Sequence, residues 1–202
     1  YDIRSASEDD RPILTGAPRH TFRRLSFLSM ATRHFYHILC SAILAIVTAA
    51  CSSVDDERIP NMAVNINLAD AGMWNTYGVS GTGLHRDFIK ELRQPAGFPY
   101  TDQTATGYGG VLLIGGMDPF TTNPNVPLAY DLSCPIECQP SIRVAVDPST
   151  LEAVCPVCGS HYDVIMAGGS PTAGPALTGN HKYSLRRYTC RPGQLGGYFI
   201  TN

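Results

Sequence analysis

Residues 109–116 read GGVLLIGG and are the most informative segment about the fold. Four apolar residues between pairs of glycines predict a short buried strand, because the run is too short for a helix and the glycines favour turns at both ends. Residues 64–68, VNINL, alternate apolar and polar side chains and predict a strand with one buried face. Further short strands, separated by glycine and proline turns, are expected at 128–132, 143–147, 152–154, 185–188 and 198–200.

One segment has a helical pattern, residues 84–92, LHRDFIKEL. Its apolar side chains recur at helical spacing, and Pro95 and Gly97 follow as stop signals. The members of the predicted apolar face are Leu84, Phe88, Ile89 and Leu92. Many short strands and one short helix predict a mainly β domain at 62–202, a small antiparallel sandwich or barrel with a cysteine-knuckle subdomain.

The composition narrows the class of protein. The chain has 202 residues, of which 44% are hydrophobic and 16% charged, and its net charge is −2. These values are typical of a globular domain and argue against a nucleic-acid partner, which would favour a basic surface. No paired carboxylates, Ser-His-Asp set or glycine-rich phosphate loop is apparent, so we expect no catalytic site.

The apolar run at 38–51, ILCSAILAIVTAAC, follows basic residues and ends in small ones. A charged region, a short apolar region and small residues before the cut are typical of a secretory signal peptide. The ending TAAC resembles the lipobox of bacterial lipoproteins. The resemblance implies a signal peptide at 30–50, removed by cleavage, and acyl chains such as palmitate on Cys51. An uncleaved membrane anchor is the alternative.

The flanks of this signal fit the same picture. Residues 1–29 show no apolar periodicity and are interpreted as a disordered or over-extended leader. Residues 51–61 form an acidic tether, whose run SSVDDER resembles the surface-export signal of Bacteroidetes lipoproteins; a plain solvated tether is the alternative. We therefore expect a lipid-anchored protein of the bacterial cell envelope, on its periplasmic or outer-membrane surface side.

Cysteines carry the most specific chemistry in the sequence. Seven are present, and five remain after Cys40 and Cys51 are assigned to the signal and the lipid. Four of the five form two close pairs, 134–138 (CPIEC) and 155–158 (CPVC), with sixteen residues between them. Two such turns brought together by strands would place the thiolates of Cys134, Cys138, Cys155 and Cys158 around one metal.

The second pair lies in a longer motif. Residues 155–163 read CPVCGSHYD and are followed by glycines at 168–169 and by GPAL at 174–177. This pattern resembles the second cluster-binding loop of Rieske iron–sulfur domains, and DLSCP at 131–135 stands where the first loop of that family belongs. The resemblance covers residues 112–188, somewhat less than two fifths of the chain. It implies a [2Fe–2S] cluster in an antiparallel β domain.

The ligand set departs from the family pattern, in which two cysteines bind one iron and two histidines the other. Cys134 and Cys155 match the family cysteines. Cys158 stands at the second histidine position and Ile136 at the first, which leaves Cys138 as the nearby substitute. An all-thiolate centre would be more negative, and lower in potential, than a Rieske centre.

Three interpretations of the cysteines stay open: a [2Fe–2S] cluster, a structural zinc ion, or no metal with disulfides that leave Cys190 unpaired. The first predicts electron transfer or redox sensing with a redox protein partner. The others predict a structural or interaction lipoprotein. His161 is either an additional ligand or a surface histidine.

Overall fold

The computed structural model describes residues 54–118, 125–166 and 168–202, and these residues belong to one compact unit. The predicted leader at 1–29, the signal peptide at 30–50 and the lipidated Cys51 lie outside the described residues. The described part is mainly β, and its two larger sheets are antiparallel, which confirms the predicted fold class. Within it, no helix is long and apolar enough to cross a membrane.

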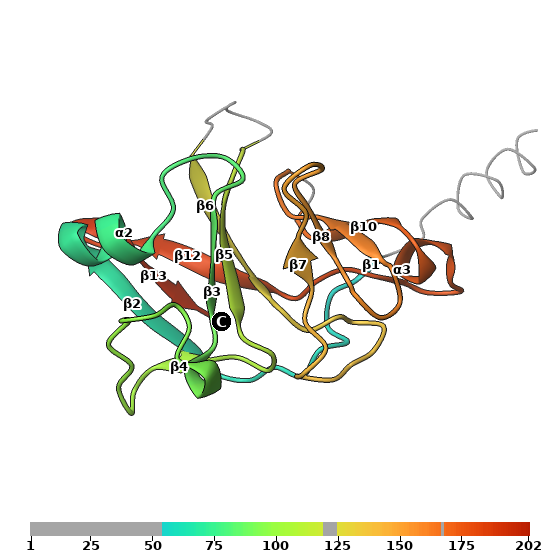
Figure 1. The fold of residues 1–202 in the computed structure, drawn as a ribbon, viewed down its shortest axis with the longest axis horizontal. Helices are drawn as coiled ribbons and strands as arrows, with labels where there is room; N and C mark the ends of the chain where they lie inside the picture. The colour runs from blue at the N-terminus through green and yellow to red at the C-terminus, as the bar shows by residue number, and fades with distance from the viewer. Residues whose placement is uncertain (1–53, 119–124, 167) are drawn as a thin grey trace, which may run out of the picture. The chain divides into compact units, whose positions relative to one another are not determined.

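The larger sheet has seven strands, paired antiparallel throughout, and is nearly closed like a barrel (Figure 1). In spatial order the strands are β3 (His85–Phe88), β5 (Val111–Gly116), β6 (Val126–Asp131), β12 (Arg187–Pro192), β13 (Gly196–Thr201), β2 (Val64–Asp70) and β4 (Ala105–Thr106). The predicted strands at 64–68, 109–116, 128–132 and 198–200 are therefore confirmed.

Strand β5 explains why the continuous apolar run is so informative. Leu112 and Ile114 join one buried cluster, whereas Val111 and Leu113 join the other. Successive side chains of a strand point to opposite faces, so a strand covered on both faces needs an unbroken apolar run. The glycine that follows is also required, because a Cβ on Gly115 would lie 2.1 Å from the carbonyl oxygen of Gly81.

The predicted helix at 84–92 is wrong. His85–Phe88 forms edge strand β3, paired antiparallel with β5, and only Lys90–Leu92 makes a short 3₁₀ turn, η1. Phe88 and Ile89 are buried, but Leu84 and Leu92 are more than half exposed. Pairing with the buried strand β5 satisfies the backbone and buries Phe88, and this tertiary gain outweighs the local helical pattern.

A second sheet, of four strands, carries the loop with Cys155 and Cys158. Its antiparallel strands, in spatial order, are β10 (Ser170–Ala173), β9 (His161–Asp163), β8 (Glu152–Val154) and β7 (Ala145–Val146). The short helix α3 (Pro175–Thr178) follows β10. Figure 1 shows β7, β8 and β10 as a group separate from the seven-stranded sheet.

A helix that the sequence reasoning missed, α2 (Ala71–Tyr77), follows β2. Asp70 caps it by accepting a hydrogen bond from the backbone N–H of Met73 at 2.9 Å. Trp74 and Tyr77 on this helix pack against the buried cluster of the seven-stranded sheet. Aspartate is a favoured N-cap residue, so Asp70 was a usable signal for a helix start. The helix that follows has only seven residues, too few to show clear periodicity.

The described part of the predicted tether is packed onto the domain. Strand β1 (Val54–Asp55) pairs in parallel with β11 (Lys182–Tyr183), and the Ile59 side chain is fully buried. The Arg186 guanidinium donates to the carbonyl oxygens of Ile59 at 2.7 Å and Glu57 at 3.2 Å. Residues 54–59 thus belong to the folded unit.

Candidate metal centre

Three cysteines from two loops converge in the structure. Cys134 follows β6, and Cys155 and Cys158 lie in the turn after β8. The three Sγ atoms all lie within 4.8 Å of one another, and those of Cys134 and Cys158 are 3.6 Å apart. Cys134 and Cys155 are buried, whereas Cys158 is partly exposed. Three thiols this close could bind a metal.

The first loop, residues 134–138, begins from a buried carboxylate. Asp131, the last residue of β6, accepts hydrogen bonds from the backbone N–H groups of Tyr108, Gly109 and Ser133 and from the Tyr188 hydroxyl at 2.6 Å. Asp131 is fully buried, so these donors replace the water that a carboxylate needs. The bond to the Ser133 N–H, at 2.7 Å, fixes the chain directly before Cys134.

The second loop, residues 155–160, is closed by its own backbone. The Cys155 N–H donates to the Ser160 carbonyl at 2.9 Å, and the Gly159 N–H donates to the Cys155 carbonyl at 3.1 Å. Gly159 has a φ of +67°, a conformation that residues with a Cβ rarely adopt. The turn therefore needs this glycine. The turn places the Cys155 and Cys158 sulfurs on the side that faces Cys134.

Two buried hydroxyls lie against the sulfurs. The Ser160 hydroxyl is 3.2 Å from the Cys158 Sγ and accepts a hydrogen bond from the Ala176 N–H at 3.1 Å. The Tyr162 hydroxyl lies 3.6 Å from the Cys134 Sγ. Hydroxyls in these positions can donate to a thiolate or to a bound sulfide, and so stabilise negative charge at the centre.

The thiols differ in acidity. Burial raises the pKa of Cys134 to about 12. Burial also acts to raise the pKa of Cys158, but hydrogen bonds from Ser160 and contacts with the other two thiols outweigh it and hold that pKa below its ordinary value. Burial next to Cys134 raises the pKa of the Tyr162 hydroxyl, which stays protonated as a donor. Cys158 is therefore more readily deprotonated than Cys134.

Cys138 is not a member of the group, contrary to the predicted convergence of four sulfurs. Its N–H donates to the Cys134 carbonyl at 2.9 Å, and its thiol donates to the backbone carbonyl of Arg58 at 3.4 Å. Its backbone has a φ of +54°. Ile136, at the family's histidine position, packs against the buried cluster that contains Cys134 and Cys155. The structure thus joins three of the four predicted ligands.

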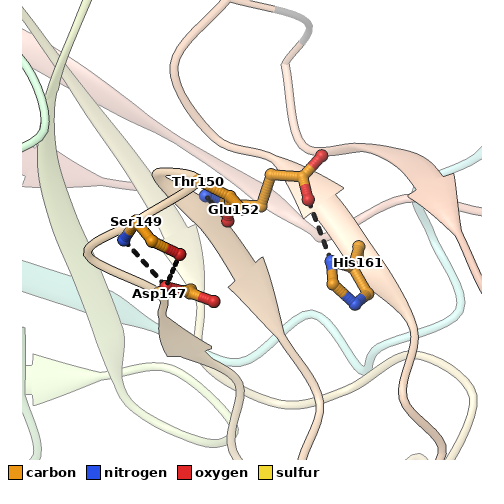
Figure 2. Close-up of polar contacts among 5 residues, drawn as sticks. All are labelled: Asp147, Ser149, Thr150, Glu152 and His161. Atoms are coloured by element: carbon orange, nitrogen blue, oxygen red, sulfur yellow. Dashed lines mark hydrogen bonds and ion pairs between the residues drawn. The ribbon is translucent and has the colours of Figure 1, made fainter.

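His161 points to a different partner. Its Nδ1 atom lies 2.9 Å from a carboxylate oxygen of Glu152 on the neighbouring strand β8, as Figure 2 shows. Both side chains are about one third exposed. In the same view Asp147 accepts hydrogen bonds from the hydroxyl and N–H of Ser149, which lower the pKa of Asp147. His161 is not in the cysteine group.

Cys190 lies in β12 of the larger sheet and packs against the other buried cluster. Burial raises its pKa to about 12, so its thiol is unreactive compared with that of Cys158.

The sequence reasoning missed Asp131 and Arg58. Asp131 stands three residues before Cys134, where a carboxylate at a strand end was a usable signal. No local pattern points to Arg58, because its partners, Pro135 and Tyr183, follow it by 77 and 125 positions in the sequence.

No protein family model, curated protein or solved structure matches the chain. The assignment of the centre rests on its residues.

Proposed function

We propose that the protein is a Rieske-like redox protein, whose cysteine centre holds a [2Fe–2S] cluster and serves electron transfer or redox sensing. The observation that carries the proposal is the convergence of Cys134, Cys155 and Cys158, with the Ser160 and Tyr162 hydroxyls against two of the sulfurs. When bound, the cluster would take up and release one electron. The chain would supply the thiolates, the hydroxyl donors and the apolar wall.

The donor set fits such a group in chemistry and in surroundings. Soft thiolates suit iron–sulfur clusters and zinc, and buried hydroxyls serve as the second layer of hydrogen bonds. Cys134, Cys155 and Cys158 would hold the group. Cys138 is the remaining thiol of the predicted set. It donates a hydrogen bond to the Arg58 carbonyl and lies outside the group of three sulfurs, so the fourth ligand position is left to another group.

A single zinc ion is the second candidate, and one distance favours it. Two thiolates on a tetrahedral zinc with bonds of about 2.3 Å lie about 3.8 Å apart. The Cys134 and Cys158 sulfurs are 3.6 Å apart, close to this sulfur–sulfur distance. With zinc the protein would be a structural or interaction lipoprotein without redox activity.

The lipid anchor is part of the proposal. Acylated Cys51 would precede Arg58, a residue in contact with the first cysteine loop, by seven residues. Seven residues span at most about 25 Å when fully extended. A lipid on Cys51 would therefore hold the centre near the membrane surface of the bacterial envelope. A membrane-associated redox protein is the partner that this placement favours.

The test is the metal content and absorption spectrum of the full chain purified without oxygen. We expect two irons and two sulfides per chain, with visible bands that bleach on reduction. Cys155→Ser should lose the bands, and Cys190→Ser, outside the centre, should keep them. Colourless protein with one zinc supports the second candidate. Metal-free protein with paired cysteines overturns both.

A further inference from the structure

The segment at 54–59 lies on the first cysteine loop. The Arg58 Nε donates to the Pro135 carbonyl at 2.6 Å, inside the loop between Cys134 and Cys138. The same guanidinium stacks over the Tyr183 ring, 4.5 Å from its centre, and reaches the Tyr183 hydroxyl at 3.3 Å. Arg58 therefore joins the loop to strand β11 through a planar group that can stack and donate together.

The segment is also held from the other side. Arg186 donates to two of its carbonyls, at Glu57 and Ile59, and the Ser184 N–H donates to the Asp55 carbonyl at 2.9 Å. Buried Ile59 fixes its end. These contacts place the Arg58 carbonyl where it accepts the hydrogen bond of the Cys138 thiol.

We propose that residues 54–59 form a latch that keeps the Cys138 thiol out of the cysteine centre. With the latch closed, the centre offers three thiolates, and the fourth position of a tetrahedral metal is open to an outside ligand. With the latch open, Cys138 becomes the fourth ligand and closes the site. The inference rests on the proposed function, in that the centre binds a metal. Arg58 and Arg186 are its positioning residues.

The latch has a consequence for signalling. The segment begins three residues after Cys51, so a pull on the N-terminal end of the chain would act on the latch before it reaches any other described element. Opening would change the number of thiolates on the metal. A movement of the anchor and the electronic state of the centre would then be coupled.

The experiment measures alkylation of each cysteine by iodoacetamide, with peptide mass spectrometry, in the reduced full chain. It compares the native protein with Arg58→Ala and Arg186→Ala. Arg191→Ala, an exposed arginine of β12, is the matched control. Without metal, Cys138 should react about fivefold faster in the two latch variants, because the loss of a typical hydrogen bond changes an equilibrium by about this factor. Equal rates in all four proteins would overturn the latch.

The second arm repeats the measurement with saturating Zn²⁺. In the native protein and in Arg191→Ala, zinc should protect Cys134, Cys155 and Cys158 but leave Cys138 reactive. In the latch variants, Cys138 should become protected as well. Full protection of Cys138 in the native protein overturns the latch alone. Zinc that protects no cysteine in any of the proteins overturns the zinc candidate and the latch with it, whereas the cluster is judged by the iron content of the protein purified without oxygen. Arg186→Ala is the second variant if Arg58→Ala fails to fold, because the Arg186 side chain donates to the carbonyls of Glu57 and Ile59 and not to that of Pro135.

Discussion

The two cysteine loops are alike in sequence but different in structure. In the second loop, residues 155–160, both thiols turn to the same side and face Cys134. In the first loop, residues 134–138, one thiol enters the centre and the other bonds to the Arg58 carbonyl. The spacing of a cysteine pair sets a turn, but the direction of each thiol is decided by what packs around that turn.

The loops also differ in how they are anchored. A buried carboxylate, Asp131, fixes the start of the first loop through four donors from three different parts of the chain. A hydroxyl, Ser160, fixes the second loop through one sulfur and one N–H. Anchors of such unequal strength predict unequal costs when each is removed.

The largest effect is expected from Asp131→Asn. The amide places an NH₂ group among N–H donors and removes charge-assisted bonds, so at least one buried donor loses its partner. The free energy of unfolding should fall by about 3 kcal/mol, measured by urea denaturation. Tyr188→Phe removes a single donor to the same carboxylate and should cost about 1 kcal/mol. Equal costs for the two variants would contradict the role of Asp131 as the shared anchor.

The next largest effect separates the two loops directly. Cys155→Ser removes one of the three converging thiols and should weaken zinc binding by about 100-fold or more, beyond the range seen for the loss of outer hydrogen bonds. Cys138→Ser should weaken it by less than about threefold, since an open position stays open. Competition with a chromophoric chelator measures both affinities. If the two variants lose affinity equally, the loops are equivalent and the difference between them does not matter for binding.

A smaller effect is expected from Ser160→Ala. The variant leaves the buried Ala176 N–H without its acceptor and should lower the free energy of unfolding by about 1 to 2 kcal/mol. It should also raise the pKa of Cys158, because burial then acts without the opposing hydroxyl. A higher pKa means less thiolate at neutral pH, so metal-free Cys158 should alkylate more slowly.

Ser149→Ala, the control for Ser160→Ala, removes an exposed hydroxyl at a turn and should change stability by less than about 0.5 kcal/mol. Unchanged Cys158 reactivity in Ser160→Ala would show that the hydroxyl does not act on the sulfur.

The smallest effect is expected from His161→Gln, just beyond the second loop. The ion pair with Glu152 is partly exposed and should contribute less than about 1 kcal/mol. Zinc affinity should stay within about threefold of that of the native protein, because His161 is not in the cysteine group. Calorimetry with zinc measures this. A tenfold loss of affinity would restore the interpretation of His161 as an additional ligand.

Local patterns predicted much of the fold. The apolar run of β5 and the alternation of β2 were sufficient, because burial on two faces or on one face leaves a different period in the sequence. The helix predicted at 84–92 failed where two periods overlap. Phe88 and Ile89 are adjacent, so they fit a helical face and also the end of a strand, and only the pairing with β5 decides between them.

The candidate site divides in the same way. The second loop was predictable from local sequence, since Gly159 and the spacing of Cys155 and Cys158 are requirements of a single turn. The position of the Cys138 thiol was not predictable in this way, because the carbonyl that accepts its hydrogen bond belongs to Arg58, eighty residues earlier. The backbone of a tight turn depends on residues close in sequence. The orientation of a thiol depends on the partners that lie near it in the folded chain.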